Sequence, residues 1–331
     1  MLMNAISTTK DYHNKIQAAL PYCLNQTHLP IGEKYEGKVR DAYDLGDYLM
    51  LITTDRLSAF DRHLALIPYK GAVLNLTSAW WFEQTKNLVP NHLIAVPDPN
   101  VVIAKKCRVF PIEFVVRGYI SGTTSTSLWT QYQKGVREYC GISFPEGLRK
   151  NQQLKQPVLT PTTKEKLHDR PISPAEIIAE GWMSEEDWLE ASQLALKLYQ
   201  RGVDLAKNHG LILVDTKYEF GRDANGQIIV VDEIHTPDSS RYWLAESYED
   251  RIAAGLEPEN IDKEFLRLWF AKNSDPYQDA TLPQAPQELI VELAGRYLQL
   301  YEKITGQAFN FIDHEEPVEQ RIMRNIANYL R

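Results

Sequence analysis

Three charged residues alternate along residues 213–221, which read Leu-Val-Asp-Thr-Lys-Tyr-Glu-Phe-Gly. Successive side chains of a β-strand point to opposite faces, so Asp215, Lys217 and Glu219 are expected to share one face. Thr216, Tyr218 and Phe220 are expected on the other face. Burying unpaired charges costs free energy, so the charged face must meet water, neighbouring charges or a charged ligand.

A tight turn is predicted directly after this strand. Asn225 and Gly226 tolerate positive φ and favour a hairpin, and the β-branched run 228–231 suits the returning strand. A loop centred on these two residues would place Glu219 directly opposite Asp232. Like charges repel at that spacing, and a divalent cation between them would turn the pair into a magnesium site of oxygen ligands. The alternative is a solvated hairpin edge with a chance charge pair.

A glycine followed by two cations indicates a second candidate site. Lys38 and Arg40 come directly after Gly37, and on one strand both would point to the same face. Flanking backbone amides and two cations suit an anion. A solvated β-hairpin explains the pattern equally well, and no P-loop motif occurs in the chain.

A third candidate site lies on a predicted strand at 112–116. Glu113 and Arg117 would share a face, and Ser121 to Thr124 would begin a helix just beyond. An arginine beside a helix N-terminus with hydroxyl groups is a receptor for phosphate or carboxylate. An N-cap and a structural Glu–Arg pair are an equally good interpretation.

Further polar residues follow the predicted hairpin on a loop, where Asp238, Ser240 and Arg241 occur together. Loops held by a rigid hairpin are favoured places for ligand-binding groups. His235, in the same loop, is interpreted as structural. The segments 55–61 and 168–169 are also polar, and each is ambiguous by itself.

Composition excludes several classes of protein. The chain has 331 residues, 44% of them hydrophobic and 24% charged, and a net charge of -8. No broad nucleic-acid surface is expected, because such surfaces carry a basic excess. No apolar run reaches the ~20 residues of a membrane span. Three widely spaced cysteines predict reduced thiols in a cytoplasmic protein.

The predicted elements are a β-rich first third followed by mixed structure and helices. Strands are expected at 35–40, 48–54, 101–104 and 112–116, and helices at 75–88, 185–208, 262–272 and 287–305. Ser184 is the expected N-cap of the longest helix. Residues 140–175, with five prolines, are expected to be irregular, and a short helix after Phe309 is expected to be peripheral.

Taken together, these segments resemble the SAICAR synthetase family of purine biosynthesis, in its longer form, from about Tyr35 to Phe309. The similarity is carried by the Asp-x-Lys-x-Glu-Phe-Gly element at 215–221 and the Pro-Ile-Glu…Arg element at 111–117. Segments 37–41, 55–61 and 232–243 add to it.

The resemblance implies an ATP-dependent ligase. ATP would phosphorylate the carboxylate of carboxyaminoimidazole ribonucleotide (CAIR), and the amine of L-aspartate would attack the acyl phosphate to give SAICAR, ADP and phosphate. The implied cofactors are ATP and Mg²⁺. The implied partners are these small molecules, with no nucleic acid and no membrane.

The resemblance also implies roles for individual residues. Lys217 and Asp215 are expected to be catalytic, and Glu219 and Asp232 to bind magnesium. The residues expected to bind ATP are Lys38, Arg40 and Lys106, with adenine near 106–112. The residues expected to bind substrate are Arg117, Ser121, Thr123, Asp238, Ser240, Arg241, Asp169, Ser58 and Asp61.

The implied fold is α+β. A β-rich, kinase-like N-terminal lobe at 1–110 would bind ATP, a central α/β part at 111–250 would hold substrate and metal, and a helical segment at 251–331 would follow. One rival is a kinase-like phosphotransferase, but neither His-Arg-Asp nor Asp-Phe-Gly occurs in the chain. The other is a non-catalytic nucleotide-binding protein, against which the retained charged motifs argue.

Overall fold

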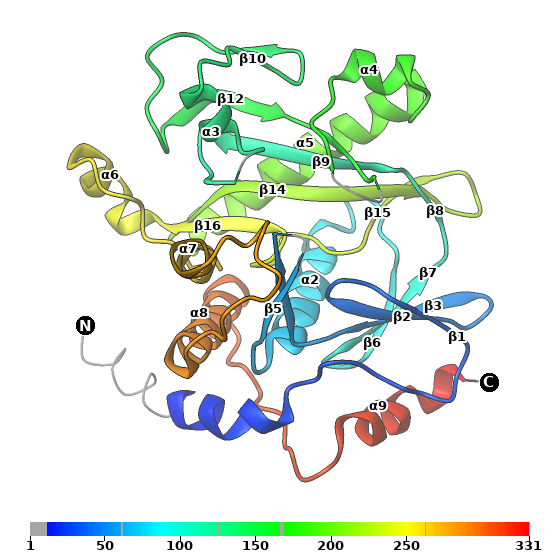
Figure 1. Cartoon of the computed structure of the whole chain (residues 1–331). Coiled ribbons are helices and arrows are strands. Elements are labelled where there is room, and N and C mark those ends of the chain that lie inside the picture. Colours follow the sequence, from blue (N-terminus) through cyan, green and yellow to red (C-terminus); the bar gives the residue numbers. More distant parts are fainter. Residues whose placement is uncertain (1–11, 61, 125, 166–168, 262, 331) are drawn as a thin grey trace. The chain divides into compact units, whose positions relative to one another are not determined.

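The computed structural model describes residues 12–330 except 61, 125, 166–168 and 262. The chain divides into two compact units, each assembled from separate segments (Figure 1). Unit 1 is Met1–Trp80, Leu93–Lys106 and Asp262–Arg331, and unit 2 is Trp81–His92 and Cys107–Ile261. Antiparallel sheets and separate helices make up both units, which confirms the predicted α+β class.

The described part of unit 1 begins with helical residues 12–19. Its remaining elements are η1 (Leu20–Tyr22), β1 (Glu33–Glu36), β2 (Arg40–Asp44), β3 (Tyr48–Thr53), β4 (Arg56–Ala59), β5 (Arg62–Leu66), α2 (Lys70–Thr85, whose end belongs to unit 2), β6 (Leu93–Asp98), β7 (Val101–Lys105), α7 (Glu264–Asn273), α8 (Gln287–Thr305), α9 (Val318–Ile326) and η2 (Ala327–Tyr329). Five strands form an antiparallel sheet in the order β1-β2-β3-β7-β6, and β4 pairs with β5.

The predicted single strand at 35–40 is wrong, because a turn separates β1 from β2. The backbone N–H of Gly37 donates to the carbonyl of Arg40 at 2.8 Å and closes this turn. The Arg56 guanidinium then donates to the carbonyls of Gly37 and Lys38, at 3.0 and 3.3 Å. Lys38 therefore lies in the turn, whereas Arg40 begins β2.

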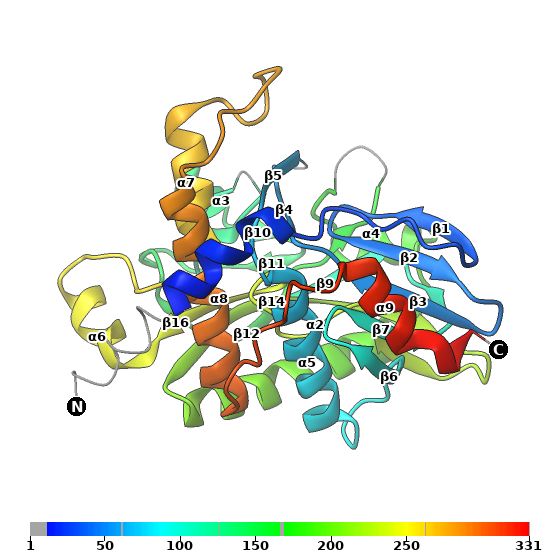
Figure 2. The same cartoon turned by 90° about the horizontal axis from the view of Figure 1, so that it is seen from below.

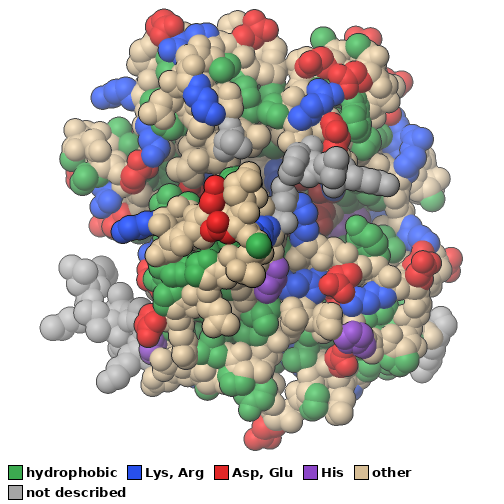
Figure 3. Space-filling model, viewed as in Figure 1, with side chains coloured by type: hydrophobic (Ala, Val, Ile, Leu, Met, Phe, Trp, Pro, Cys, Tyr) green, Lys and Arg blue, Asp and Glu red, His purple; other side chains and the backbone are tan. Residues whose placement is uncertain are grey.

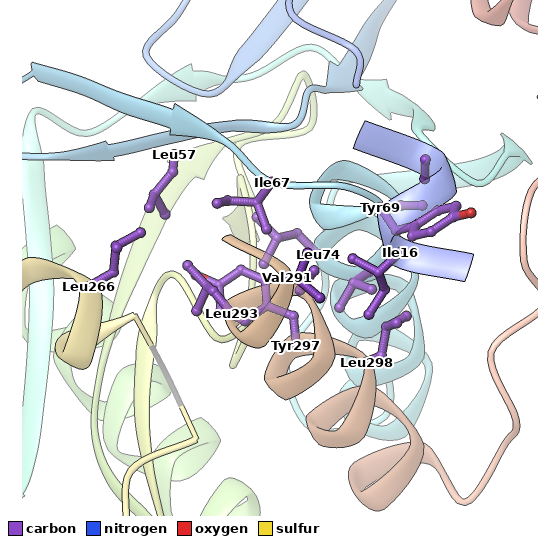
Figure 4. Packing of buried hydrophobic residues seen from close by; sticks show 14 of the residues in the cluster. Ile16, Leu57, Ile67, Tyr69, Leu74, Leu266, Val291, Leu293, Tyr297 and Leu298 are labelled. Carbon is purple, nitrogen blue, oxygen red and sulfur yellow. The ribbon is translucent and has the colours of Figure 1, made fainter. Parts of the chain in front are cut away.

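Helices α2 and α8 contribute to the main core of unit 1. Apolar residues of α8 recur at three- and four-residue spacing, as expected for a helix with one buried face. Val291, Tyr297 and Leu298 of α8 share this core with Leu74 of α2 and with Ile16 (Figure 4). The helix ends at Gly306, whose φ of 69° suits a C-cap. The predicted helix at 287–305 is confirmed.

The C-terminal helix α9 is not peripheral, and that prediction is wrong. Its residues Ile322 and Ile326 are fully buried in a cluster with Met50 and Ile52 of β3. Figure 2 shows α9 lying against the five-stranded sheet. Its Arg321 is also buried, where it binds Asp98 at the end of β6. The helix is therefore part of the core of unit 1.

Unit 2 is built around a seven-stranded sheet. Its elements are β8 (Arg108–Val109), β9 (Ile112–Tyr119), α3 (Leu128–Gln133), β10 (Glu138–Tyr139), β11 (Ile142–Ser143), β12 (Gln153–Leu159), β13 (Thr162–Thr163), α4 (Pro174–Ala179), α5 (Glu185–Asn208), β14 (Leu211–Arg222), β15 (Ile228–Val231), β16 (Ser240–Leu244) and α6 (Ala245–Ala253). The main path is β12-β9-β14-β15, with β13 on β9 and with β8 and β16 on β14 (Figure 1).

Residues 140–175 are more regular than predicted, because β12 and β13 both pair with β9. Pro157 lies within β12, which is an edge strand with an irregular register. An edge strand tolerates proline, since it has one row of N–H groups without a strand partner. Pro157 therefore fits the edge of the sheet, and Pro174 begins helix α4.

The predicted helix at 185–208 is confirmed as α5. The Ser184 hydroxyl accepts a hydrogen bond from the N–H of Asp187 at 3.1 Å and caps it. Its apolar side packs on the sheet, where Trp188 stacks on Phe114 of β9 with ring centroids 5.2 Å apart. No helix among the described residues is long and apolar enough to cross a membrane.

Candidate functional site

The charged residues of β14 lie on one face of the strand, as predicted. Asp215, Lys217 and Glu219 each form an ion pair with a side chain from another segment. On the opposite face, Tyr218 and Phe220 are fully buried in the core. The hydrophobic effect therefore anchors β14 from behind and presents its charges on the other side.

Two arginines contact Asp215 and make this end of the charged face cationic. Its Oδ2 accepts a hydrogen bond from Nη1 of Arg241 at 2.7 Å and lies 3.5 Å from Nη1 of Arg117. Nη1 of Arg241 also donates to the Ser121 hydroxyl at 2.8 Å. Two guanidinium groups and one carboxylate leave one net positive charge, which suits an anionic ligand.

The sheet brings these groups together. Asp215 is the cross-strand partner of Arg117 on β9 and of Arg241 on β16. Nε of Arg117 donates to the Thr160 hydroxyl at 2.8 Å, which fixes the guanidinium from its other side. Neighbouring strands lie about 4.8 Å apart, so both arginines reach the same carboxylate.

Lys217 lies in the middle of the face and contacts Glu113 of β9, with Nζ 2.7 Å from Oε1. Burial alone would lower the Lys217 pKa, but the charges of Glu113 and Glu219 outweigh it and raise this pKa. Burial would likewise raise the Glu113 pKa, but the Lys217 charge lowers it. Both groups therefore stay charged at neutral pH. The Lys217 side chain remains 38% exposed and accessible to a ligand.

The hairpin register differs from the prediction by one residue. Glu219 lies opposite Val231 rather than Asp232. The N–H of Asp223 bonds to the carbonyl of Gln227 at 3.0 Å, which leaves a three-residue loop in which Gly226 has a φ of 79°. Three-residue hairpins place glycine at this left-handed position, whereas the predicted two-residue turn needs two such residues.

Glu219 and Asp232 nevertheless interact electrostatically. Burial and the Asp232 charge both raise the Glu219 pKa, and an ion pair with Lys164 opposes them. The Glu219 side chain is only 12% exposed. Asp232 follows β15 at a φ of 64°. This end of β14 therefore brings two carboxyl groups and the Lys164 ammonium together, in contrast with the two arginines at Asp215.

The described residues contain no group of three or more His, Cys, Asp or Glu side chains arranged to hold a metal ion. A pair of carboxylates is compatible with Mg²⁺, which keeps several waters and binds substrate phosphates alongside one or two protein carboxylates. Burial and, after it, repulsion by Asp232 raise the Glu219 pKa, and a bound cation would favour the charged form of both carboxylates.

The remaining predicted residues of unit 2 differ in their surroundings. Ser240 is buried and donates to the Thr216 hydroxyl at 2.7 Å. Thr123 and Asp169 are exposed, and Asp238 is half-buried in the loop before β16. The predicted helix start at Ser121 is wrong, because α3 begins only at Leu128; before it, Gly122 turns the chain at a φ of 102°.

The predicted residues of unit 1 lie on its sheet and turns. Nε of Arg40 donates to the Thr53 hydroxyl at 3.3 Å, and Lys38 is exposed in the preceding turn. The Lys106 ammonium binds the Asp44 carboxylate at 2.8 Å, which lowers the Asp44 pKa. Ser58 is half-buried in β4. Asp61 lies outside the described residues.

Two residues of the charged face had not been assigned to it from the sequence. Glu113 was matched with Arg117 but binds Lys217, and Lys164 was not singled out but binds Glu219. The partners are 104 and 55 residues apart. No local pattern marks such pairs, because the fold of the sheet creates them.

Unit 1 also contains a small polar cavity that no predicted site residue lines. Its volume is about 20 Å³, and Cys23, Asp55, Tyr69 and Arg321 contribute to its wall. This is room for a single water molecule and far too little for a nucleotide. On the face drawn in Figure 3, acidic and basic side chains are interspersed.

A sequence model of the family described as SAICAR synthetase matches residues 33–284. The phosphoribosylaminoimidazole-succinocarboxamide synthase of Legionella pneumophila (strain Paris) is 72% identical over 311 residues, which span 94% of this chain and 100% of that protein. Both matches cover the charged face of β14 and the segments that surround it.

Two solved structures share the fold. A SAICAR synthase from Saccharomyces cerevisiae complexed with SAICAR has a TM-score of 0.74 and 33% identity, covering 87% of this chain and 99% of that one. A SAICAR synthetase in complex with ADP has a TM-score of 0.65 and 27% identity, covering 84% and 100%. The resemblance expected from the motifs is therefore confirmed, and the chain belongs to the SAICAR synthetase family, the ligases of purine biosynthesis that bear this name.

Proposed function

We propose that this chain uses ATP to join CAIR and L-aspartate into SAICAR, with ADP and phosphate as the other products, and that the charged face of β14 carries the reaction. The supporting observation is the order of charges along this strand. Two arginines contact Asp215, Lys217 lies in the middle, and Glu219 lies near the Asp232 carboxylate and pairs with Lys164. Residues 215 and 219 are four apart, so the ends are separated by about 13 Å.

The cationic end is assigned to the ribonucleotide. Arg117 and Arg241 offer planar donor groups suited to phosphate or carboxylate oxygens. Asp215 holds both guanidinium groups and acts through them as a positioning residue. The other residues of unit 2 assigned to substrate are Ser121, Thr123, Asp169, Asp238 and Ser240.

The carboxylate end is assigned to magnesium. Glu219 and Asp232 supply oxygen ligands, and when bound there the ion would offset negative charge on ATP phosphates. Lys164 forms an ion pair with Glu219, so its ammonium would add positive charge beside these carboxylates to that of a bound magnesium ion. Lys217, held by Glu113, directs its ammonium between the two ends of the face.

Nucleotide binding is assigned to the β-rich segment 1–110, with phosphate contacts from Lys38, Arg40 and Lys106. Lys38 is exposed in the turn before β2, where its ammonium can meet an anion. The central segment 111–250 is assigned to substrate and metal. The segment 251–331 supports the fold through α7, α8 and α9.

The reaction needs two group transfers, a phosphoryl transfer followed by an acyl transfer. A carboxylate oxygen of CAIR attacks the γ-phosphorus of ATP, which forms an acyl phosphate and releases ADP. The amine of L-aspartate then attacks the acyl carbon, the C–N bond forms, phosphate leaves, and the nitrogen loses a proton. Negative charge grows on transferring and leaving oxygens in both steps. The Lys217 ammonium is placed to stabilise it electrostatically.

Release of ADP should require both co-substrates. Because the acyl phosphate forms on CAIR and is consumed by the amine of L-aspartate, omitting either one should reduce steady-state ADP release to near background. Coupled detection of ADP with each substrate omitted in turn tests this. Brisk ADP release with neither present, or phosphorylation of an added hydroxyl acceptor, would contradict the ligase.

Replacing Arg241 with lysine should weaken ribonucleotide binding selectively. The substitution keeps the charge but loses the planar group that binds both Asp215 and the Ser121 hydroxyl. We expect the KM for CAIR to rise about tenfold, a loss of ~1.4 kcal/mol in apparent binding, while the KM for ATP changes little. Steady-state kinetics measures both constants. An equal rise for ATP would assign Arg241 to the nucleotide or to the structure.

A further inference from the structure

The loop 232–239 carries two of the residues assigned above, Asp232 and Asp238, and its backbone is constrained. Asp232 and His235 have φ values of 64° and 52°. Residues other than glycine seldom adopt these angles unless their surroundings enforce them, and such positions concentrate at functional sites. The cause of the conformation must therefore lie in contacts made by the loop.

Part of the constraint comes from hydrogen bonds within the loop. The Thr236 hydroxyl donates to Glu233 at 2.6 Å and accepts from the N–H of Ser239 at 3.2 Å. The N–H of Ser240 donates a hydrogen bond to the carbonyl of Thr236 at 2.9 Å. These bonds make the loop compact, but they do not fix it to the sheet.

Two contacts attach the loop to β14: the N–H of Lys217 donates to the Ser239 carbonyl at 3.1 Å, and the His235 side chain bonds to Tyr218. Its ring is fully buried, and Nε2 shares a short hydrogen bond with the hydroxyl of Tyr218. Trp81 packs edge-on against the ring with centroids 4.6 Å apart. From α5, the chain at Gly202 approaches so closely that a Cβ there would lie 2.3 Å from Cε1 of His235. The Tyr242 hydroxyl donates to the His235 carbonyl at 2.8 Å.

The contact with Tyr218 links the loop to the charged face. Tyr218 lies between Lys217 and Glu219 on β14, and its side chain points into the core while theirs point to the site. Burial lowers the His235 pKa to about 3, so the ring is neutral at working pH. Its Nδ1 is buried and has no hydrogen-bond partner in the described structure.

We propose that His235 is a positioning residue, which clamps the 232–239 loop to the back of β14 and so sets Asp232 against Glu219 for a divalent cation. The proposal rests on the assignment of these two carboxylates to the metal. His235 lies within the core and acts on the reaction only through the loop.

Mn²⁺ binding to the substrate-free protein, followed by electron paramagnetic resonance, tests the proposal without relying on turnover. His235→Asn keeps a residue that tolerates positive φ but cannot reach Tyr218. Tyr218→Phe removes only the hydroxyl and leaves the loop sequence unchanged. We expect the Mn²⁺ dissociation constant to rise about tenfold in the first variant and about threefold in the second, with the Mg²⁺ requirement for turnover rising in parallel.

Tyr199→Phe is the matched control. It removes a buried hydroxyl that lies 2.8 and 3.0 Å from the carbonyls of Leu213 and Val214, so it takes away hydrogen bonding to β14 and leaves the His235–Tyr218 bond in place. It should lower the Tm while Mn²⁺ binding stays unchanged. If His235→Asn and Tyr218→Phe also lower only the Tm, His235 is structural and the proposal is overturned. If His235→Asn does not fold, Tyr218→Phe decides.

Glu219→Gln separates failure of this proposal from failure of the metal assignment. It should weaken Mn²⁺ binding more than either clamp variant. Unchanged Mn²⁺ binding in folded Glu219→Gln would overturn the metal assignment and the role of His235 with it. Weakened binding there, together with normal binding in both clamp variants, would overturn the role of His235 alone.

Discussion

Lys217→Met is expected to lower kcat about a thousandfold while the dissociation constant of ATP stays within about threefold of the wild-type value. The Lys217 ammonium faces the site, and Glu113 holds it at 2.7 Å. Removing one preorganised donor from a site of developing negative charge typically costs 10²–10³ in rate, about 3–4 kcal/mol. Rapid-quench kinetics and calorimetric titration of ATP give the two constants.

Two further variants separate chemistry from folding. Lys217→Met leaves Glu113 without its ion-pair partner, so the double variant with Glu113→Gln should regain thermal stability but not turnover. Lys207→Met changes an exposed lysine at the end of α5 and should keep full activity. Recovery of kcat in the double variant would show that Lys217 acts only through the structure.

The face of β14 could be predicted because it depends on local geometry alone. Asp215, Lys217 and Glu219 alternate with residues that seek the core, and a period of two residues decides which side each occupies. The long helix α5 could be predicted for the same reason. Ser184 marks its start, and apolar residues at helical spacing mark its buried side. Neither feature needs information from a distant part of the chain.

The register of the neighbouring hairpin could not be predicted from the same stretch. Asn225 and Gly226 suit both a two-residue and a three-residue loop, and the two differ in the backbone angles of single residues. Within the turn 224–226 of the structure, only Gly226 adopts positive φ. The cross-strand partner of Glu219 is therefore Val231 and not the predicted Asp232. Burial and the Asp232 charge both raise the Glu219 pKa, so the two carboxylates still influence one another, and their joint binding of magnesium stays a prediction.

Partners from distant segments were the part of the site that sequence could not reveal. Arg117 and Arg241 meet at Asp215 only because β9 and β16 both pair with β14. Lys164 reaches Glu219 from the segment just after β13, within a region that prolines made look irregular. Cross-strand contacts of this kind depend on strand order, which local propensity does not encode.

The C-terminal helix α9 was predicted to be peripheral because its buried face contains a charged residue. Ile322 and Ile326 have the four-residue spacing of a core face, but Arg321 and the acidic residues before it resemble a solvated end. The structure pairs Arg321 with Asp98, whose side chain is fully buried, through bonds of 2.9 and 3.1 Å. A buried ion pair therefore weakens the hydrophobic pattern by which a core helix is recognised in a sequence.

Arg321→Met should therefore destabilise the fold by about 3–5 kcal/mol, since it leaves the buried Asp98 carboxylate without its counter-charge. It also removes the 2.8 Å bond to Asn100, although the bond from Asn325 to Asp98 at 2.7 Å remains. Urea unfolding followed by circular dichroism measures the change.

Because the loss of stability arises from an uncompensated charge, adding Asp98→Asn should restore at least half of it. Arg324→Met, on the exposed side of the same helix, should leave unfolding almost unchanged. Equal effects of the two arginine variants would mean that α9 is stabilised by its apolar contacts alone and that the buried pair contributes nothing.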